Sequence, residues 1–350
     1  MKTKTKNIIQ YLFFLFLGIF LLWLCFRNID LGQTLEHIKE ARLLWMFLSL
    51  LFLFTSLFFR ALRWNILLNS VGCKTRSTST FCSVLIAYMA NLAVPRIGEV
   101  ARCAVLSRKE NTPFDKAFGT VISERIFDMI VLLLLALVVV VAQWSLLGDM
   151  VLSWFRPFVS LMNDNVWVML AALALLSLLV LLTIIFIRRL RLGLRNGNHS
   201  NPAVKFLSGL IAGLQSILRM DKKGLFMFYT LMLWVLYIPM TWLPFMMFEE
   251  TSLLTMIDAI TLLGISTIGF VVPVPGGVGT YHGLVMVLLP ILDEGISSAR
   301  ALSFATINHA VQSMFYVVAG IISYVIMFFI DKQIPLNECI KENNEQDKEC

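Results

Sequence analysis

Residues 126–144 read IFDMIVLLLLALVVVVAQW, a run long and apolar enough to cross a lipid bilayer as one helix. A spanning helix needs roughly 20 mostly apolar residues, because its rise of about 1.5 Å per residue must cover about 30 Å of hydrocarbon. The sequence shows no series of ten-residue alternating segments, which are typical of membrane barrels. Five further runs qualify as helical crossings: residues 8–26, 43–59, 166–187, 225–248 and 304–330. We therefore predict an all-α polytopic membrane protein with about six full crossings.

The composition supports this class. Of 350 residues, 58% are apolar and 15% charged, and the mean hydropathy is +0.80, whereas a soluble domain has about 25% charged residues. With the N-terminus in the cytoplasm, only five of the 29 basic residues fall in outer loops: Arg27, Lys39, Arg42, Arg156 and Arg300. This positive-inside pattern predicts an inner (cell) membrane protein with both termini cytoplasmic. The net charge of +7 then favours anionic lipid headgroups over nucleic acid.

Two apolar stretches do not fit six plain crossings. Residues 81–95 are short and end at a proline, and residues 259–292 are interrupted by prolines and glycines. Because each is flanked by loops of one kind, we expect two re-entrant or broken helical segments, which brings the apolar segments to about eight. The alternative is two short helices kinked by proline. The re-entrant reading gives one transmembrane domain, residues 1–330, with inverted repeats at about 43–147 and 225–330, and a cytoplasmic polar tail, residues 331–350.

Residues 91–102, NLAVPRIGEVAR, put charges beside an apolar run. Each charge at the bilayer centre costs about 2.5–3.5 kcal/mol on insertion scales, so such charges pair or bind a ligand. Arginine suits phosphate, which it grips with two parallel hydrogen bonds. We predict that four residues contact a lipid headgroup: Asn91, Arg96, Glu99 and Arg102. The alternative is an interfacial loop in which Glu99 pairs with Arg102.

Residues 123–128, SERIFD, begin the run quoted first. Glu124 and Asp128 lie one helical turn apart, and Arg125 can reach Asp128. We predict that Glu124, Arg125 and Asp128 form a structural polar clamp that holds this helix to the loop of Glu99. The costs of burying these charges predict one buried polar unit rather than isolated groups.

Residues 269–283, GFVVPVPGGVGTYHG, concentrate two prolines and several glycines within an apolar stretch. Backbone amides freed there can bind an anion, and the alternative is a plain hinge. The segment lacks the G-K-[ST] ending of a nucleotide loop. On the last apolar run, polar residues including His309 and Gln312 share one helical face, which must avoid lipid. From these segments we add six headgroup-site candidates: Gly276, Gly277, Gly279, His282, His309 and Gln312.

Motifs for chemistry are lacking in the sequence. The six cysteines form no C-x-x-C pair or zinc-ligand spacing, and we expect them to be reduced and structural. We find no H-E-x-x-H, G-x-S-x-G or P-loop motif. We therefore predict no catalytic residue, no metal site and no cofactor.

The motifs together resemble the transmembrane region of lysylphosphatidylglycerol synthases and related flippase-like membrane proteins, over about residues 43–330. The resemblance rests on three groups in the family's order: Asn91, Pro95, Arg96, Gly98 and Glu99; Glu124, Arg125 and Asp128; and Pro273, Pro275, Gly276, Gly277 and Gly279. It implies movement of a modified phospholipid between leaflets. In the family a separate soluble domain charges the lipid with an amino acid, and we do not carry that lysyltransferase activity over.

The sequence departs from the family at His282, where an acidic residue is usual. A histidine there could make a site sensitive to pH near neutrality. The leading hypothesis is a translocator of an anionic or modified phospholipid, or of a lipid-linked substrate. The alternatives are a membrane-embedded lipid transferase, with His282, His309 or Glu99 as base, and a non-catalytic partner of a separate synthase or glycosyltransferase.

Overall fold

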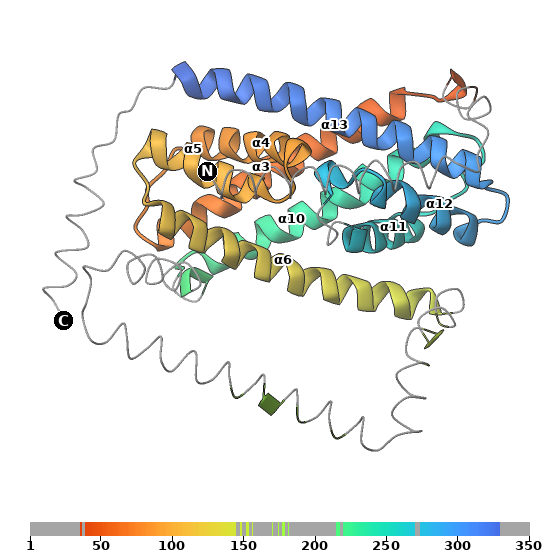
Figure 1. Cartoon of the computed structure of the whole chain (residues 1–350), viewed down its shortest axis with the longest axis horizontal. Coiled ribbons are helices and arrows are strands. Elements are labelled where there is room, and N and C mark those ends of the chain that lie inside the picture. The colour runs from red at the N-terminus through yellow and green to blue at the C-terminus, as the bar shows by residue number, and fades with distance from the viewer. Residues whose placement is uncertain are drawn as a thin grey trace, which may run out of the picture.

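The computed structural model describes residues 39–144, 220–269 and 274–329, with isolated positions outside these ranges. The described part is helical (Figure 1). Its elements are α3 (Leu44–Ser70), α4 (Ser77–Ala93), α5 (Ile97–Glu110), α6 (Phe114–Ala142), α10 (Lys223–Trp242), η1 (Leu243–Met247), α11 (Met256–Gly269), η2 (Pro275–Gly277), α12 (Thr280–Leu292) and α13 (Ser298–Phe329). The predicted crossings at residues 8–26 and 166–187, and the tail 331–350, lie outside the described ranges.

Five segments in the described part are long and apolar enough to cross a membrane. They are Leu44–Ser70, Phe114–Ala142, Lys223–Met247, Pro275–Leu292 and Ser298–Phe329. Their outward surfaces carry exposed leucine, valine, isoleucine and phenylalanine side chains, most densely on α6 and α13, as expected of helices that face lipid rather than water. The prediction of an all-α polytopic membrane protein is confirmed, and the number of crossings stays a prediction.

Helices α4 and α5 form a tight hairpin that brings Glu99 and Arg102 back towards α3. Val94 is extended and Arg96 has a φ of 60°, while Pro95 lacks the amide needed to continue the helix. The side-chain oxygen of Asn91 accepts a hydrogen bond from the Gly98 amide at 2.7 Å. A Cβ on Gly98 would collide with the carbonyl oxygen of Ala87, so only glycine allows this close approach of α5 to α4.

The prolines and glycines of residues 273–279 interrupt the second stretch, as the sequence predicts. Helix α11 ends at Gly269, and α12 begins after Gly279. Gly276, Gly277 and Gly279 have φ values of 60°, 75° and 84°, a left-handed conformation that is strained for other residues. At 14 residues, α11 measures about 21 Å, short of a full crossing, whereas η2 and α12 together form one of the five long apolar segments.

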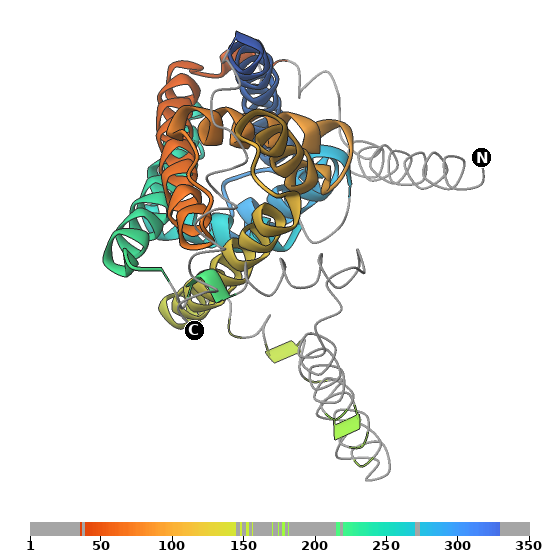
Figure 2. The ribbon, with the colours of Figure 1, turned by 90° about the vertical axis from the view of Figure 1, so that its left-hand side faces the viewer.

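The two hairpin turns lie in contact. A Cβ on Gly276 would lie 3.1 Å from Cδ2 and 3.8 Å from Cα of Leu92, at the end of α4. Helix α13 packs along both hairpins, against α4 and α12, and α3 packs side by side with α10 (Figures 1 and 2). The contact between the turns agrees with the predicted repeat. The inverted repeat itself, and the membrane face from which each hairpin enters, stay predictions.

Each hairpin is embedded in its own apolar cluster. Around α4 and α5 the cluster includes Leu57, Trp64, Leu106 and Phe226. Around α11 and α12 it includes Met46, Phe245, Leu289 and Phe304. The long helix α3 contributes to both clusters, so it ties the two hairpins into one bundle. Within the described residues, Cys73, Cys82 and Cys103 are buried cysteines.

Candidate functional site

Two arginines of α3 face two carboxylates of α6 in the interior of the bundle. Arg60 and Arg63 are three residues apart, and Glu124 and Asp128 are four apart, so each pair occupies one face of its helix. Arg102 joins them from α5. The ion pairs are Arg60–Glu124 at 3.1 Å, Arg63–Glu124 at 3.0 Å, Arg102–Glu124 at 2.9 Å, Arg60–Asp128 at 3.3 Å and Arg63–Asp128 at 2.6 Å. We call these five residues the arginine cluster.

The arginine cluster carries more positive than negative charge. Three guanidinium groups meet two carboxylates, and the side chains of Glu124 and Arg63 are 0% exposed. Burial of ionised groups is tolerated only when partners and hydrogen bonds offset the lost hydration. Arg102 also makes a cation–π contact, because its guanidinium carbon lies 4.6 Å from the centre of the Trp64 ring. The surplus charge makes the cluster an attractive environment for an anion.

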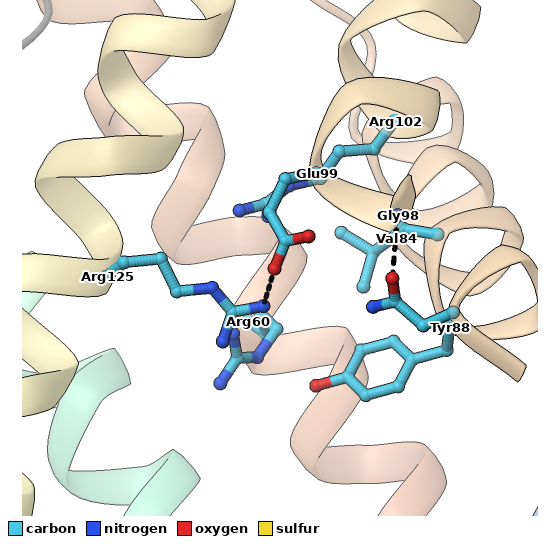
Figure 3. A pocket seen from close by; sticks show the side chains of 9 residues that line it. Arg60, Val84, Tyr88, Gly98, Glu99, Arg102 and Arg125 are labelled. Atoms are coloured by element: carbon cyan, nitrogen blue, oxygen red, sulfur yellow. Dashed lines mark hydrogen bonds and ion pairs between the residues drawn. The ribbon is translucent and has the colours of Figure 1, made fainter. Parts of the chain in front are cut away.

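A small pocket opens beside the arginine cluster (Figure 3). Its lining comes from four helices: Arg60, Val84, Ala87, Tyr88, Asn91, Gly98, Glu99, Arg102 and Arg125. Glu99 and Arg125 reach towards each other and pair at 2.8 Å. This pair is partly exposed, with 23% and 46% of the two side chains accessible. It therefore stands at the mouth of the pocket, whereas Arg60 and Arg102 are buried in its wall.

Some polar atoms in this region have capacity left for a ligand. Nη2 of Arg102 and Nε of Arg60 are buried and have no hydrogen-bond partner among the described residues. Arg60 donates through Nη2 to the Tyr237 hydroxyl at 3.2 Å. A guanidinium that has an N–H group without a partner can hydrogen-bond an oxyanion without giving up its existing ion pair.

The residues predicted from segments 91–102 and 123–128 lie in or beside this pocket, except Arg96. The structure joins Asn91, Glu99 and Arg102 in the pocket lining. Arg125 forms an ion pair with Glu99, whereas Glu124 and Asp128 form ion pairs with the arginines of α3. Arg96 lies exposed at the turn and does not line the pocket. Glu99 pairs with Arg125 and not with Arg102, its neighbour at helical spacing.

Arg60 and Arg63 are functional candidates that the sequence reasoning missed. They directly follow the predicted crossing at residues 43–59. In the structure α3 continues to Ser70, and the two residues are 5% and 0% exposed. The apolar run that resumes at Trp64 and Ile66 was the available signal, because it continues the helix beyond the arginines.

A second polar group surrounds the turn at residues 274–279, which we call the Gly-rich turn. Its members include histidines but no other acidic or basic side chain. His309 Nε2 lies 2.9 Å from the Gly276 carbonyl oxygen. The rings of His282 and His309 are 5.2 Å apart. Asn308 donates to the Tyr281 hydroxyl at 2.5 Å and accepts from Gln312 at 2.9 Å. The structure thus gathers the predicted residues Gly276, His282, His309 and Gln312, with Gly277 and Gly279 shaping the backbone.

The candidate residues of the two turns lie in two separate polar groups. The pocket is lined from α3, α4, α5 and α6, and the Gly-rich turn contributes none of its lining. The apolar side chain of Leu92 lies against Gly276 and so separates the two turns.

Comparison with known proteins places the chain in a family. The family model described as the lysylphosphatidylglycerol synthase TM region matches residues 7–320. Among curated proteins and among solved structures, none gives a significant match. The match covers most of the chain, including both hairpins and every candidate residue named above. The protein therefore belongs to the lysylphosphatidylglycerol synthase TM region family.

Proposed function

We propose that this protein moves a phospholipid, or a lipid-linked substrate with an anionic headgroup, between the leaflets of the inner membrane. The headgroup binds in the pocket beside the arginine cluster, and the acyl chains stay in the surrounding lipid. Family membership connects the chain with membrane lipid metabolism or flipping. The charge distribution along the sequence supports cytoplasmic termini.

The observation that carries this proposal is the surplus guanidinium charge at a pocket. Three buried arginines face two buried carboxylates, and Arg102 Nη2 has no hydrogen-bond partner among the described residues. In a low-dielectric interior a surplus cation is costly unless an anion neutralises it. A phosphate oxygen suits the planar fork of arginine, so a phosphate-bearing headgroup completes the charge balance.

The short arms of the first hairpin support access from the membrane. At 17 and 14 residues, α4 and α5 measure about 25 Å and 21 Å, less than the hydrocarbon thickness. Broken helices that end inside transporters expose backbone and polar groups to substrate near the midplane. The transferase alternative gains no support, because Glu99 is paired with Arg125 and the histidines lie in the other polar group.

Replacement of Arg102 by glutamine tests the proposal. This change removes the surplus charge, yet Glu124 keeps its ion pairs with Arg60 and Arg63. The purified protein is reconstituted in liposomes with fluorescent phosphatidylglycerol, aminoacylated phosphatidylglycerol or phosphatidylcholine, and a membrane-impermeant reductant reports leaflet exchange. We expect wild-type protein to prefer anionic lipid, and Arg102→Gln to slow exchange by about 10- to 100-fold, the equivalent of a lost charged hydrogen bond.

The matched control is Arg108→Gln, which removes an exposed arginine from the same helix. It should exchange lipid at the wild-type rate. Wild-type rates from Arg102→Gln, or equal wild-type rates for anionic lipid and phosphatidylcholine, would contradict a headgroup site at the arginine cluster.

A further inference from the structure

Polar side chains on α13 connect the two polar groups. Asn308, Gln312 and Tyr316 follow one another at intervals of four residues and so share one face of the helix. Gln312 donates to Asn308 at 2.9 Å, and Asn308 donates to Tyr281 of α12 at 2.5 Å. His309, one residue on, lies 2.9 Å from the Gly276 carbonyl oxygen. This end of the row therefore reaches the Gly-rich turn.

The other end of the row reaches the arginine pocket. The ring of Tyr316 stacks on that of Tyr88 with 4.8 Å between centroids and 20° between planes, and Tyr88 lines the pocket. From Asn308 to Tyr316 the row extends about 12 Å along the helix axis. We define these residues as the polar ladder: Tyr88, Tyr316, Gln312, Asn308, Tyr281 and His309.

Asn308 of the ladder is buried and its other members are half-buried, while the other side of α13 is apolar. Asn308 is 5% exposed, whereas Met314, Val317 and Val318 are exposed. Polar side chains cost free energy inside a bundle, and an apolar seam between α4, α12 and α13 would pack the helices at lower cost. Hydrogen bonds between the ladder residues offset that cost but do not explain why polar residues occupy the seam from pocket to turn.

The chemistry of the ladder differs from that of the pocket. Amide and phenol groups both donate and accept hydrogen bonds, so they can replace the water around a headgroup one contact at a time. The ladder lacks arginine, lysine and carboxylates, which would hold an ion strongly. Conduction through a protein requires sites weak enough to release what they bind. At its far end, His282 Nδ1 is buried with no hydrogen-bond partner among the described residues.

We propose that the polar ladder is the path by which a phosphate-bearing lipid headgroup moves between the arginine pocket and the Gly-rich turn. This inference rests on the proposed function and adds the route to it. The headgroup binds at the arginine pocket and then exchanges hydrogen bonds along Tyr316, Gln312 and Asn308. Those side chains separate from one another as it passes, and they close again behind it.

The test separates headgroup binding from lipid movement. Wild-type protein, Gln312→Leu and Asn308→Leu are each assayed for leaflet exchange of fluorescent phosphatidylglycerol in liposomes, and for phosphatidylglycerol retained on the detergent-purified protein by native mass spectrometry. We expect each leucine variant to retain lipid as wild type does, and to slow exchange by about tenfold, the equivalent of one lost hydrogen bond. A purely structural role would change retention and thermal stability together with exchange.

Thr306→Val is the matched control. Thr306 is a polar residue of the same helix. Among the described residues its hydroxyl bonds within its own helix, donating to the Leu302 carbonyl oxygen at 2.8 Å. The control should leave retention and exchange unchanged. If the leucine variants melt at lower temperature, Tyr281→Phe and Tyr316→Phe decide instead, because each removes one hydroxyl and preserves the ring.

The outcomes distinguish the route from the function. Wild-type exchange in the leucine variants, or in the phenylalanine variants that replace them, overturns the ladder as the path and leaves the arginine pocket standing. Loss of lipid retention in step with exchange also overturns it, because the ladder would then only support the pocket. Absence of phosphatidylglycerol exchange by wild-type protein overturns the proposed function itself.

Discussion

The two hairpins have similar backbones but different chemistry. Each consists of two short helices joined by a turn with left-handed residues, and each turn contacts the other at Leu92 and Gly276. Around the first hairpin, carboxylates and guanidinium groups form a buried network. Around the second, histidine, tyrosine and amide side chains meet. In the function we propose, charge holds a headgroup at one hairpin, whereas neutral dipoles let it leave at the other.

The turns also differ in why they need glycine. Gly98 has an ordinary helical conformation. A glycine is needed there because α4 packs so closely that a Cβ would collide with it. Gly276 is needed for its positive φ, and an added Cβ there meets the flexible end of Leu92. The first hairpin is therefore fixed by close helix packing, and the second by backbone conformation.

The largest effect expected from this comparison is at Glu124. Glu124→Gln leaves Arg60, Arg63 and Arg102 with Asp128 as the one remaining carboxylate of the cluster, and breaking a buried ion pair costs about 3–5 kcal/mol. We expect a large fall in the melting temperature in detergent. Glu294→Gln, which changes an exposed glutamate, is the control and should melt as wild type does. Equal melting of both variants would show that burial of the cluster does not matter for stability.

A smaller effect is expected at Gly98. Gly98→Ala forces α5 away from α4, because the new Cβ collides with the Ala87 carbonyl oxygen and the Asn91 side chain. Overpacking of this kind costs about 1–3 kcal/mol, which thermal unfolding in detergent would reveal. In the second hairpin, Gly264→Ala provides the control, since nothing lies within 4 Å of its added Cβ. If Gly98→Ala were as stable as Gly264→Ala, close packing would not define the first hairpin.

The smallest effect is expected at the mouth of the pocket, where charge is present without deep burial. Glu99 and Arg125 are partly exposed, and exposed ion pairs contribute about 0.2–1 kcal/mol. A double-mutant cycle of Glu99→Gln and Arg125→Gln should give a coupling energy in that range, which decreases as salt is added. A coupling as large as the effect of Glu124→Gln would mean that charge alone, rather than its burial, distinguishes the hairpins.

The sequence by itself determined the fold class of this protein and the positions of its two hairpin turns. Long apolar runs require helices, because backbone polar groups in lipid must be satisfied within each segment. Pro95 and the glycines from Gly276 to Gly279 mark interruptions through local backbone geometry. These features depend on neighbouring residues alone, so one sequence reveals them. The same reasoning placed Glu124 and Asp128 on one helical face.

The tertiary structure decided which charges meet. Arg60 and Glu124 are 64 positions apart in the chain, and helical periodicity cannot show that α3 presents its arginines to α6. The sequence reading ended the crossing at residue 59 because a charge usually marks the membrane surface. Packing instead supplies each arginine with buried carboxylates, which makes a longer helix possible. Only the fold could reveal this, because the energy of a buried charge depends on partners that are remote in sequence.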